Sequence, residues 1–240
     1  MQANPAVLRR RRERLFYVGM SIAVVITVFA GFAPTYYLRP LFTTAPLKPL
    51  LHFHGLVFTS WLVLFVVQTT LVAAHRTDIH RRLGLVGGVI SALMVLVGVT
   101  TALMRAKQDI TVPGTPALVF LTVPLGDMSV FAILVAAGFY FRRQPDVHKR
   151  LMLLATISIL AAATGRLPFA FAQNSPVGFF GLADLFIVLC LLYDLITLRR
   201  IHRATALGGL LIVASQPLRL MIGATHAWLV VATWLTQFVP

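Results

Sequence analysis

Long apolar runs follow one another along almost the whole chain. Six of them lie at 16–37, 53–74, 83–104, 116–141, 148–169 and 178–198. A helix of roughly 20 apolar residues crosses the hydrocarbon core of a bilayer. Of all residues 58% are hydrophobic and only 12% are charged, whereas soluble domains are about 25% charged. The sequence therefore predicts an all-α, polytopic transmembrane helix bundle whose solvent is a lipid bilayer.

The remaining apolar region, 205–238, allows two interpretations. Its middle, "SQPLRLMIGATHAW", is too polar for a regular span, and a proline inside a helix removes a backbone hydrogen bond. The region is either one long tilted helix bent at Pro217 or a helix followed by a short second piece. We predict about seven helices, with eight as the alternative.

Basic residues separate into two unequal groups when these runs cross the membrane in turn. One side carries fifteen Lys and Arg residues and the other side four. The fifteen are Arg9, Arg10, Arg11, Arg12, Arg14, Arg76, Arg81, Arg82, Arg142, Arg143, Lys149, Arg150, Arg199, Arg200 and Arg203; the four are Arg39, Lys48, Arg105 and Lys107. Positive residues accumulate in cytoplasmic connections. We therefore predict a cytoplasmic N-terminus in a multi-pass protein of the inner (cell) membrane, and the net charge of +14 does not indicate a nucleic-acid partner.

The connections between the runs are too short to form a separate soluble domain. We predict a basic cytoplasmic segment at 1–15 and a single transmembrane domain at 16–240. The single cysteine, Cys190, cannot form an internal disulfide. The sequence contains no Walker loop, GxSxG or HExxH motif, so nothing in it indicates a hydrolase or an ATP-driven pump.

The predicted topology sorts the histidines into two layers. His75, His80, His148 and His202 fall at the cytoplasmic edge, and His52, His54 and His226 fall toward the outer edge. The layers are roughly 25–30 Å apart, so any shared site must be built within one of them.

In the inner layer, His80 and His148 open two helices with related sequences, "HRRLG" and "HKRLM". Two neutral imidazoles on facing helices are suitable axial ligands for a haem iron. We predict that these two residues hold the iron of a haem b. Anchoring of polar rings at the membrane interface is the alternative, and it is our interpretation of His75 and His202.

In the outer layer, His54 begins a stripe that continues with Trp61 and Gln68. Residues seven apart stay near one face of a helix, with a drift of about 20° per heptad. An amide in lipid is costly, so the stripe should face protein. With His226, His54 is predicted to hold a second haem or to form part of a quinone pocket; ordinary bundle packing is the alternative.

Four charged residues, Asp127, Arg166, Asp184 and Arg219, lie within predicted spans or at their ends. Such residues usually pair or line a cavity because a charge in lipid is costly. They are expected to form either an ion-pair network that fixes helix register or a polar pocket for a quinone headgroup, an anion or a proton path. Asp194, near the cytoplasmic end of the sixth predicted helix, is expected to pair with a loop arginine.

These motifs carry a resemblance over about half of the chain. "LHFHGLVFTSWLVLFVVQTTLVAAHRTDIHRRLGLVGG" and "HKRLMLLATISILAAATGR" resemble a family of small bacterial multi-helix membrane proteins of unknown function. The resemblance implies membrane location. In architecture the chain is also similar to membrane cytochromes of the b561 type, which implies histidines paired across facing helices. The residues that match the bacterial family are His54, Gly55, Trp61, Gln68, His80, Arg81, Gly84, His148, Arg150, Met152 and Arg166.

Three functions follow from these patterns as hypotheses. The first is a haem-b membrane protein that passes electrons to or from a quinone or another redox partner. The second is a carrier, channel or sensor for a small solute, ion or proton that uses the buried Asp and Arg residues. The third is a structural or assembly subunit of a membrane complex.

Overall fold

The computed structural model describes residues 5–110, 114–173 and 175–239, with side chains from residue 11 onward. This part of the chain is helical and contains no strand. The helices are α1 Pro5–Phe32, α2 Pro49–Ala73, α3 Thr77–Lys107, α4 Ala117–Phe120, α5 Thr122–Tyr140, α6 Pro145–Ser158, α7 Ala161–Thr164, α8 Ala170–Gln173, α9 Pro176–Leu198, α10 Arg203–Gly223 and α11 His226–Leu235. A π-helical turn at Ala33–Tyr37 and 3-10 turns at Arg39–Leu41 and Thr236–Phe238 complete them.

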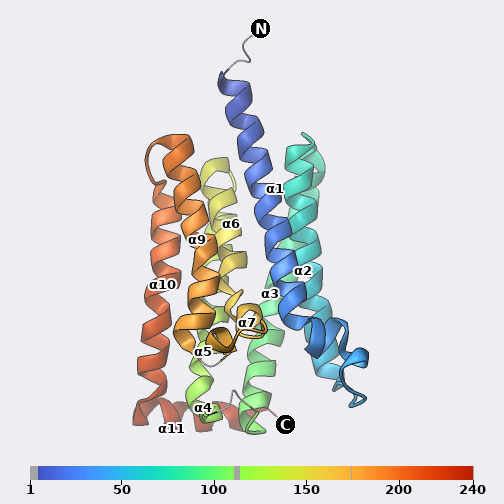
Figure 1. Cartoon of the computed structure of the whole chain (residues 1–240), viewed down its shortest axis with the longest axis vertical. Helices are drawn as coiled ribbons and strands as arrows, with labels where there is room; N and C mark the ends of the chain where they lie inside the picture. Colours follow the sequence, from blue (N-terminus) through green and yellow to red (C-terminus); the bar gives the residue numbers. More distant parts are fainter. Residues whose placement is uncertain (1–4, 111–113, 174, 240) are drawn as a thin grey trace.

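Among these residues, seven helical segments are long and apolar enough to cross a membrane. They lie side by side, and the two chain termini lie at opposite ends of the bundle (Figure 1). We call the end where α1 begins the N-terminal end and the other the C-terminal end. The prediction of an all-α polytopic bundle of seven helices is confirmed.

The region after residue 205 follows the second of the two predicted interpretations. Helix α10 continues through Pro217 and ends at Gly223, and α11 then lies across the C-terminal end of the bundle (Figure 1). The ten residues of α11 span about 15 Å, half of what a bilayer core requires. Its start is fixed because Thr225 Oγ1 accepts a hydrogen bond from the N–H of Trp228 at 3.2 Å. The first interpretation, a single long helix through 205–238, was therefore wrong.

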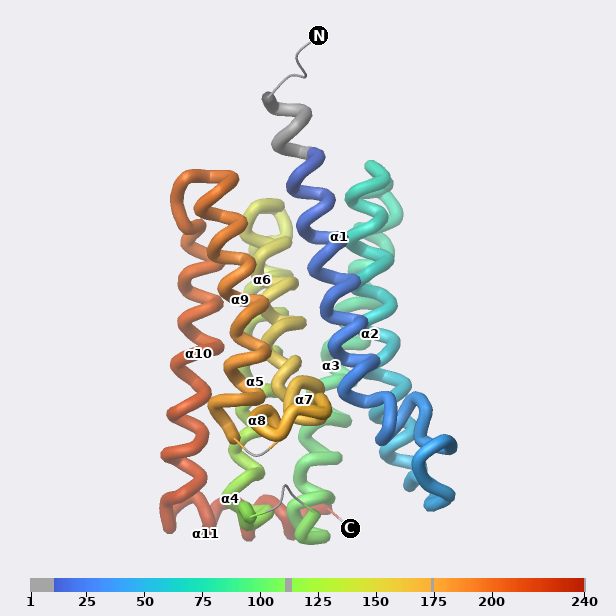
Figure 2. The backbone as a smooth tube through the Cα atoms, in the orientation of Figure 1, coloured from blue at the N-terminus to red at the C-terminus, as the bar shows by residue number. Residues whose placement is uncertain are grey.

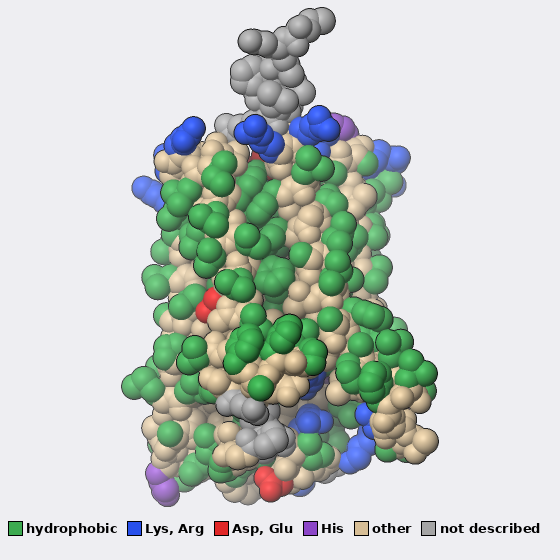
Figure 3. Space-filling view, in the orientation of Figure 1, with side chains coloured by type: hydrophobic (Ala, Val, Ile, Leu, Met, Phe, Trp, Pro, Cys, Tyr) green, Lys and Arg blue, Asp and Glu red, His purple; other side chains and the backbone are tan. Residues whose placement is uncertain are grey.

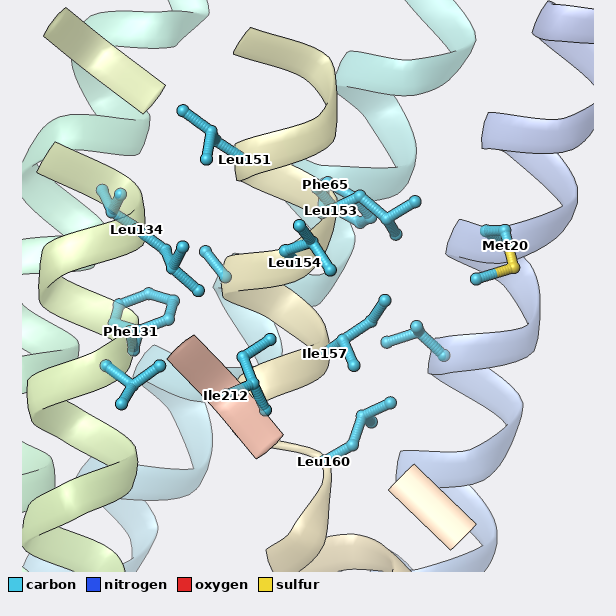
Figure 4. Close-up of a cluster of buried hydrophobic side chains, with 14 of the residues drawn as sticks. Met20, Phe65, Phe131, Leu134, Leu151, Leu153, Leu154, Ile157, Leu160 and Ile212 are labelled. Atoms are coloured by element: carbon cyan, nitrogen blue, oxygen red, sulfur yellow. The ribbon is translucent and has the colours of Figure 1, made fainter. Parts of the chain in front are cut away.

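Helix α6 is the most enclosed of the seven spans. It packs against α5, α9 and α10 and also contacts α1. Its apolar side chains point to several sides into a core shared with the neighbouring helices (Figure 4). The labelled core residues are Met20, Phe65, Phe131, Leu134, Leu151, Leu153, Leu154, Ile157, Leu160 and Ile212. A helix surrounded by protein needs apolar residues all round, which is why the sequence of α6 shows no polar face after its first turns.

Two short helices interrupt the regular bundle. After α6 ends at Ser158, α7 and α8 form compact turns next to the lower part of α9 (Figure 2). Helix α7 also packs against α1. These turns fold the segment 165–169 into the C-terminal half of the bundle, where it carries Arg166.

The outer surface separates apolar sides from a basic end. Lys and Arg side chains gather at the N-terminal end, and hydrophobic side chains cover most of the visible side of the bundle (Figure 3). Large apolar residues such as Leu85, Tyr140 and Ile196 are each more than two-thirds exposed. A surface of this kind is stable when lipid covers it, so the chain is a multi-pass membrane protein.

Candidate functional site

His80 and His148 face each other at the N-terminal end of the bundle. Each is the fourth residue of its helix, His80 in α3 and His148 in α6. Their ring centroids are 6.2 Å apart and the ring planes are 81° to each other. Two imidazoles that bind one metal ion from opposite sides, at about 2 Å each, place their centroids roughly 6 Å apart. The pair therefore has the spacing of two axial ligands.

The hydrogen bonds of His148 select the tautomer that a metal ligand requires. Its Nδ1 lies 2.8 Å from the carbonyl oxygen of Gly138, near the end of α5. A carbonyl can only accept, so Nδ1 carries the hydrogen in this bond and Nε2 keeps its lone pair. A hydrogen bond of this kind on the remote nitrogen is the usual second partner of a metal-bound histidine.

Gln68 lies beside His80. Its Nε2 donates to the backbone oxygen of His80 at 3.2 Å, which ties the end of α2 to the first turn of α3. Nδ1 of His80 and Oε1 of Gln68 are both buried and have no hydrogen-bond partner among the described residues. Buried polar atoms usually have hydrogen-bond partners. Two buried polar atoms without partners on neighbouring residues therefore indicate a site that is completed by movement or by a further group.

The backbone beside His80 leaves room for a flat group. One turn further along α3, a Cβ built on Gly84 would meet no atom within 4 Å. At Gly88, a Cβ would lie 3.6 Å from the ring of Phe139, so this ring closes the space toward the membrane centre. Open backbone next to an axial ligand pair fits a haem, and it fits a bare metal ion less well because only two protein ligands are present. No group of three or more His, Cys, Asp or Glu side chains that could hold a metal ion occurs among the described residues.

The other two histidines of this layer make structural contacts. His75 is exposed, and its Nε2 lies 2.8 Å from Nη1 of Arg14. His202 is the N-cap of α10, where its Nδ1 accepts a hydrogen bond from the N–H of Ala204 at 3.1 Å. Neither ring has a histidine partner in the part of the chain that is described.

Replacement of His202 tests the cap directly. His202→Ala is expected to lower the free energy of unfolding by about 1 kcal/mol, because the cap acceptor is lost. His202→Asn keeps an acceptor, so its stability at pH 8 should stay close to that of the wild type. Thermal unfolding in detergent measures both, and an unchanged melting temperature for His202→Ala would contradict the capping role.

The His202 variants are also expected to differ from the wild type in how their stability depends on pH. Burial, and next the Arg150 charge, lower the pKa of His202 from its ordinary value of 6.5. The folded protein thus favours the neutral ring, and the stability from this preference is present above pH 6.5 and is lost as pH falls through the lowered pKa. His202→Asn should therefore lose less stability than the wild type on acidification below pH 6.5. Equal losses would show that His202 does not contribute.

The stripe on α2 faces protein, as its spacing predicts. Trp61 is buried, its Nε1 donates to Thr156 Oγ1 of α6 at 3.3 Å, and its ring packs on Phe131 with centroids 5.2 Å apart. His54 stacks on Phe58 at 4.1 Å, and its Nδ1 is buried with no partner among the described residues. Trp61 thus packs between α2, α5 and α6. In contrast, Nδ1 of His54 makes no hydrogen bond to the described residues.

The expected site shared by His54 and His226 does not form. His226 is exposed at the start of α11, below α10, whereas α2 lies on the opposite side of the bundle (Figure 1). The two residues share a depth but not a lateral position. A second haem or a quinone pocket between them is therefore excluded by the fold.

Asp127 and Arg219 form a buried ion pair between α5 and α10. Nη1 of Arg219 donates to Oδ1 of Asp127, and its Nη2 donates to Ser215 Oγ at 2.8 Å. The two side chains are 6% and 8% exposed. Gly126 allows this approach, because a Cβ there would lie 2.8 Å from Cγ of Arg219. The pair links two helices at fixed register, which is the first of the two roles expected for these charges.

The other expected members of the polar set lie elsewhere. Asp184 accepts a hydrogen bond from Gln216 Nε2 at 2.8 Å. Arg166 donates from Nη1 to the carbonyl of Ala162, and its guanidinium lies 4.6 Å from the centroid of the Phe32 ring. The structure therefore divides the four residues into an ion pair, an Asp–Gln pair and an arginine without an acidic partner among the described residues. One pocket lined by all four is not formed.

Asp194 pairs with an arginine, but this residue, Arg150, lies within α6 and not in a loop as expected. Nε of Arg150 lies 3.1 Å from its Oδ1, and the N–H of His202 lies 3.2 Å from its Oδ2. Thr205 Oγ1 also donates to this carboxylate. The buried cluster joins α6, α9 and α10.

Several partners of these side chains were not predicted from the sequence. Ser215 and Gln216 lie in the polar segment before Pro217, and the i, i+4 spacing of Ser215 and Arg219 could have indicated their bond. Gly138 contributes only a backbone oxygen, for which the sequence carries no side-chain signal.

The chain matches no family model, no curated protein and no solved structure in comparisons with known proteins. Its resemblance to the bacterial membrane family and to the b561 architecture stays a prediction. Any function must therefore be argued from the site itself.

Proposed function

We propose that this protein binds a haem b between His80 and His148 and transfers electrons within the bacterial inner membrane. The facing pair of rings, 6.2 Å apart, is the observation that carries this proposal. With the basic N-terminal end in the cytoplasm, the haem would lie near the inner face of the membrane. A bound haem supplies one-electron redox chemistry.

The residues around the pair have separable tasks in this proposal. Gly138 holds the His148 ring in the orientation and tautomer that leave Nε2 free, and Gln68 holds the first turn of α3. Exposed arginines flank both histidines and would neutralise the carboxylates of the porphyrin edge. These are Arg81, Arg82, Arg142 and Arg143. A membrane quinone is the proposed electron partner, because it reaches lipid-covered helices by lateral diffusion.

Absorption spectra of the purified protein test the proposal. Protein from haem-replete cells should show a Soret band that shifts on reduction with dithionite. His80→Ala and His148→Ala should each abolish the band or alter it strongly, because an axial ligand is lost. His75→Ala is the matched control, since His75 lies at the same end of the bundle but is exposed and has no histidine partner.

Two results would contradict the haem proposal. One is a colourless wild-type protein from haem-replete cells. The other is a spectrum that stays the same in both ligand variants. Colourless protein that purifies with a larger membrane complex would instead favour the assembly hypothesis.

A further inference from the structure

Two arginines at the C-terminal end of the bundle have no acidic partner in the part of the chain that the structure describes. Among the described residues, neither Arg105 nor Arg166 forms an ion pair. The acidic residue nearest to Arg105 in the sequence is Asp109. It is exposed and forms no ion pair among the described residues. A charge that is partly removed from water without a counter-charge is costly, so this arrangement needs a reason.

The two arginines also act on each other. Burial, and next the positive charge of Arg105, lower the pKa of Arg166 to about 10. The Arg166 side chain is nonetheless exposed, so it does not lie in a closed core. Lys and Arg side chains are visible in a hollow in the lower half of the bundle (Figure 3). The hollow is therefore positive and open.

Among the described residues, Arg166 uses only a small part of its hydrogen-bonding capacity. A guanidinium has five N–H donors. In Arg166 one nitrogen donates to the carbonyl of Ala162, and the flat face lies against the Phe32 ring. Packing on one aromatic face and bonding to one carbonyl hold the group in place and leave its other edge free for a ligand.

Two further polar groups lie on the wall formed by α2 and α3. The ring of His54 lies next to the backbone carbonyl of Val97, and the charged side chains that act on it are Arg166 and Arg105. Thr101 and Arg105 follow Val97 at intervals of four, so all three share one face of α3. Thr101 is 6% exposed, and its Oγ1, like Nδ1 of His54, is buried without a partner among the described residues.

The direction of α3 brings these groups together. Side chains on a helix lean toward its N-terminus. The Cα–Cβ bond of Arg105 therefore points back along α3, on the side of Thr101 and Val97. Arg166 enters the same region from the segment between α7 and α8.

We propose that Arg105 and Arg166, with Thr101 and His54, form a binding site for a phosphate-type oxyanion at the C-terminal end of the bundle. Arginine forks bind tetrahedral oxyanions through paired, charge-assisted hydrogen bonds. A dianion would balance the two positive charges, the Thr101 hydroxyl would supply a neutral donor to it, and the His54 ring would line the site. The ligand is either a soluble phosphate or the phosphate of an anionic lipid headgroup. The site is separate from the histidine pair at the other end and does not depend on it.

Thermal unfolding with inorganic phosphate tests the site. At constant ionic strength, phosphate should raise the melting temperature of the wild type in a saturable way, by about 5–11 °C at 100 times the dissociation constant. Arg105→Gln and Arg166→Gln should each weaken phosphate binding by about tenfold or more, because a charged hydrogen bond is lost. Lys48→Gln is the control at the same end, since Lys48 is exposed and bonds to Gln108. If a glutamine variant does not fold, the corresponding Arg→Lys variant, which keeps the charge but loses the fork, should also bind more weakly.

Nanodiscs distinguish the two sources of phosphate. If the ligand is a lipid, free phosphate has little effect, and discs of phosphatidylglycerol stabilise the wild type more than discs of phosphatidylcholine. The two Arg→Gln variants should lose this difference, and Lys48→Gln should keep it. The proposal is overturned if neither phosphate nor phosphatidylglycerol distinguishes the wild type from the arginine variants, or if Lys48→Gln loses the effect equally.

Discussion

Replacement of Asp127 by leucine is expected to lower the free energy of unfolding by about 3–5 kcal/mol. The substitution removes one partner of a buried ion pair and leaves the positive charge of Arg219 in a low-dielectric environment. Arg219 cannot move to water easily, because its side chain lies against Gly126 and its Nη2 is held by Ser215. Unfolding in detergent, followed by circular dichroism, measures the loss.

The double variant Asp127→Leu/Arg219→Met is the matched control. Removing both charges removes the uncompensated one, and apolar replacements of buried pairs are often neutral or stabilising. The double variant should therefore recover most of the stability that Asp127→Leu loses. If it is as unstable as the single variant, the loss comes from packing and not from the unpaired charge.

Replacement of Gly31 by alanine is expected to lower the free energy of unfolding by about 2 kcal/mol. A Cβ at this position would lie 2.9 Å from the carbonyl carbon of Ala163 and closer still to its oxygen. The obstacle is backbone, which cannot rotate away as a side chain can, so α1 and α7 must separate. Overpacking of this kind costs about 1–3 kcal/mol or more, and it outweighs the higher helix propensity of alanine, which is worth about 1 kcal/mol.

Gly19→Ala provides the control on the same helix. A Cβ at Gly19 would meet no atom within 4 Å, and the residue is exposed on the side of α1. Its replacement should leave the melting temperature unchanged or raise it slightly. Equal behaviour of the two variants would show that α1 and α7 do not approach as closely as the structure places them.

The spans were predictable because each depends only on the composition of one continuous run of residues along the membrane normal. Each run that crosses lipid must be apolar over about 20 residues, and the basic residues between the runs mark one end. After residue 205 the same reasoning left two interpretations open, because apolar composition continues through α10 and α11. The turn at Thr225 comes from a cap and from the bond of Trp228 Nε1 to the backbone oxygen of Leu118, 2.8 Å away. This tertiary contact has no counterpart in local composition.

The candidate site shows the same division. His80 and His148 were predicted as a pair because both open helices at the same end with similar residues, and the structure places their rings together. His54 and His226 were matched by depth alone, and they lie on different sides of the bundle. The four charged residues of the predicted spans were also grouped by depth, yet only Asp127 and Arg219 meet.

The sequence by itself determined the depth of each residue in the membrane, since hydrophobicity and charge act along the membrane normal. It did not determine which residues of one layer are neighbours. That depends on how the other spanning helices pack with α6 and on close backbone approaches such as Gly31 to Ala163. It also depends on the turn that carries Arg166 toward Arg105. Packing is decided by the shapes of surfaces from distant parts of the chain, so only the tertiary structure could show which side chains face each other.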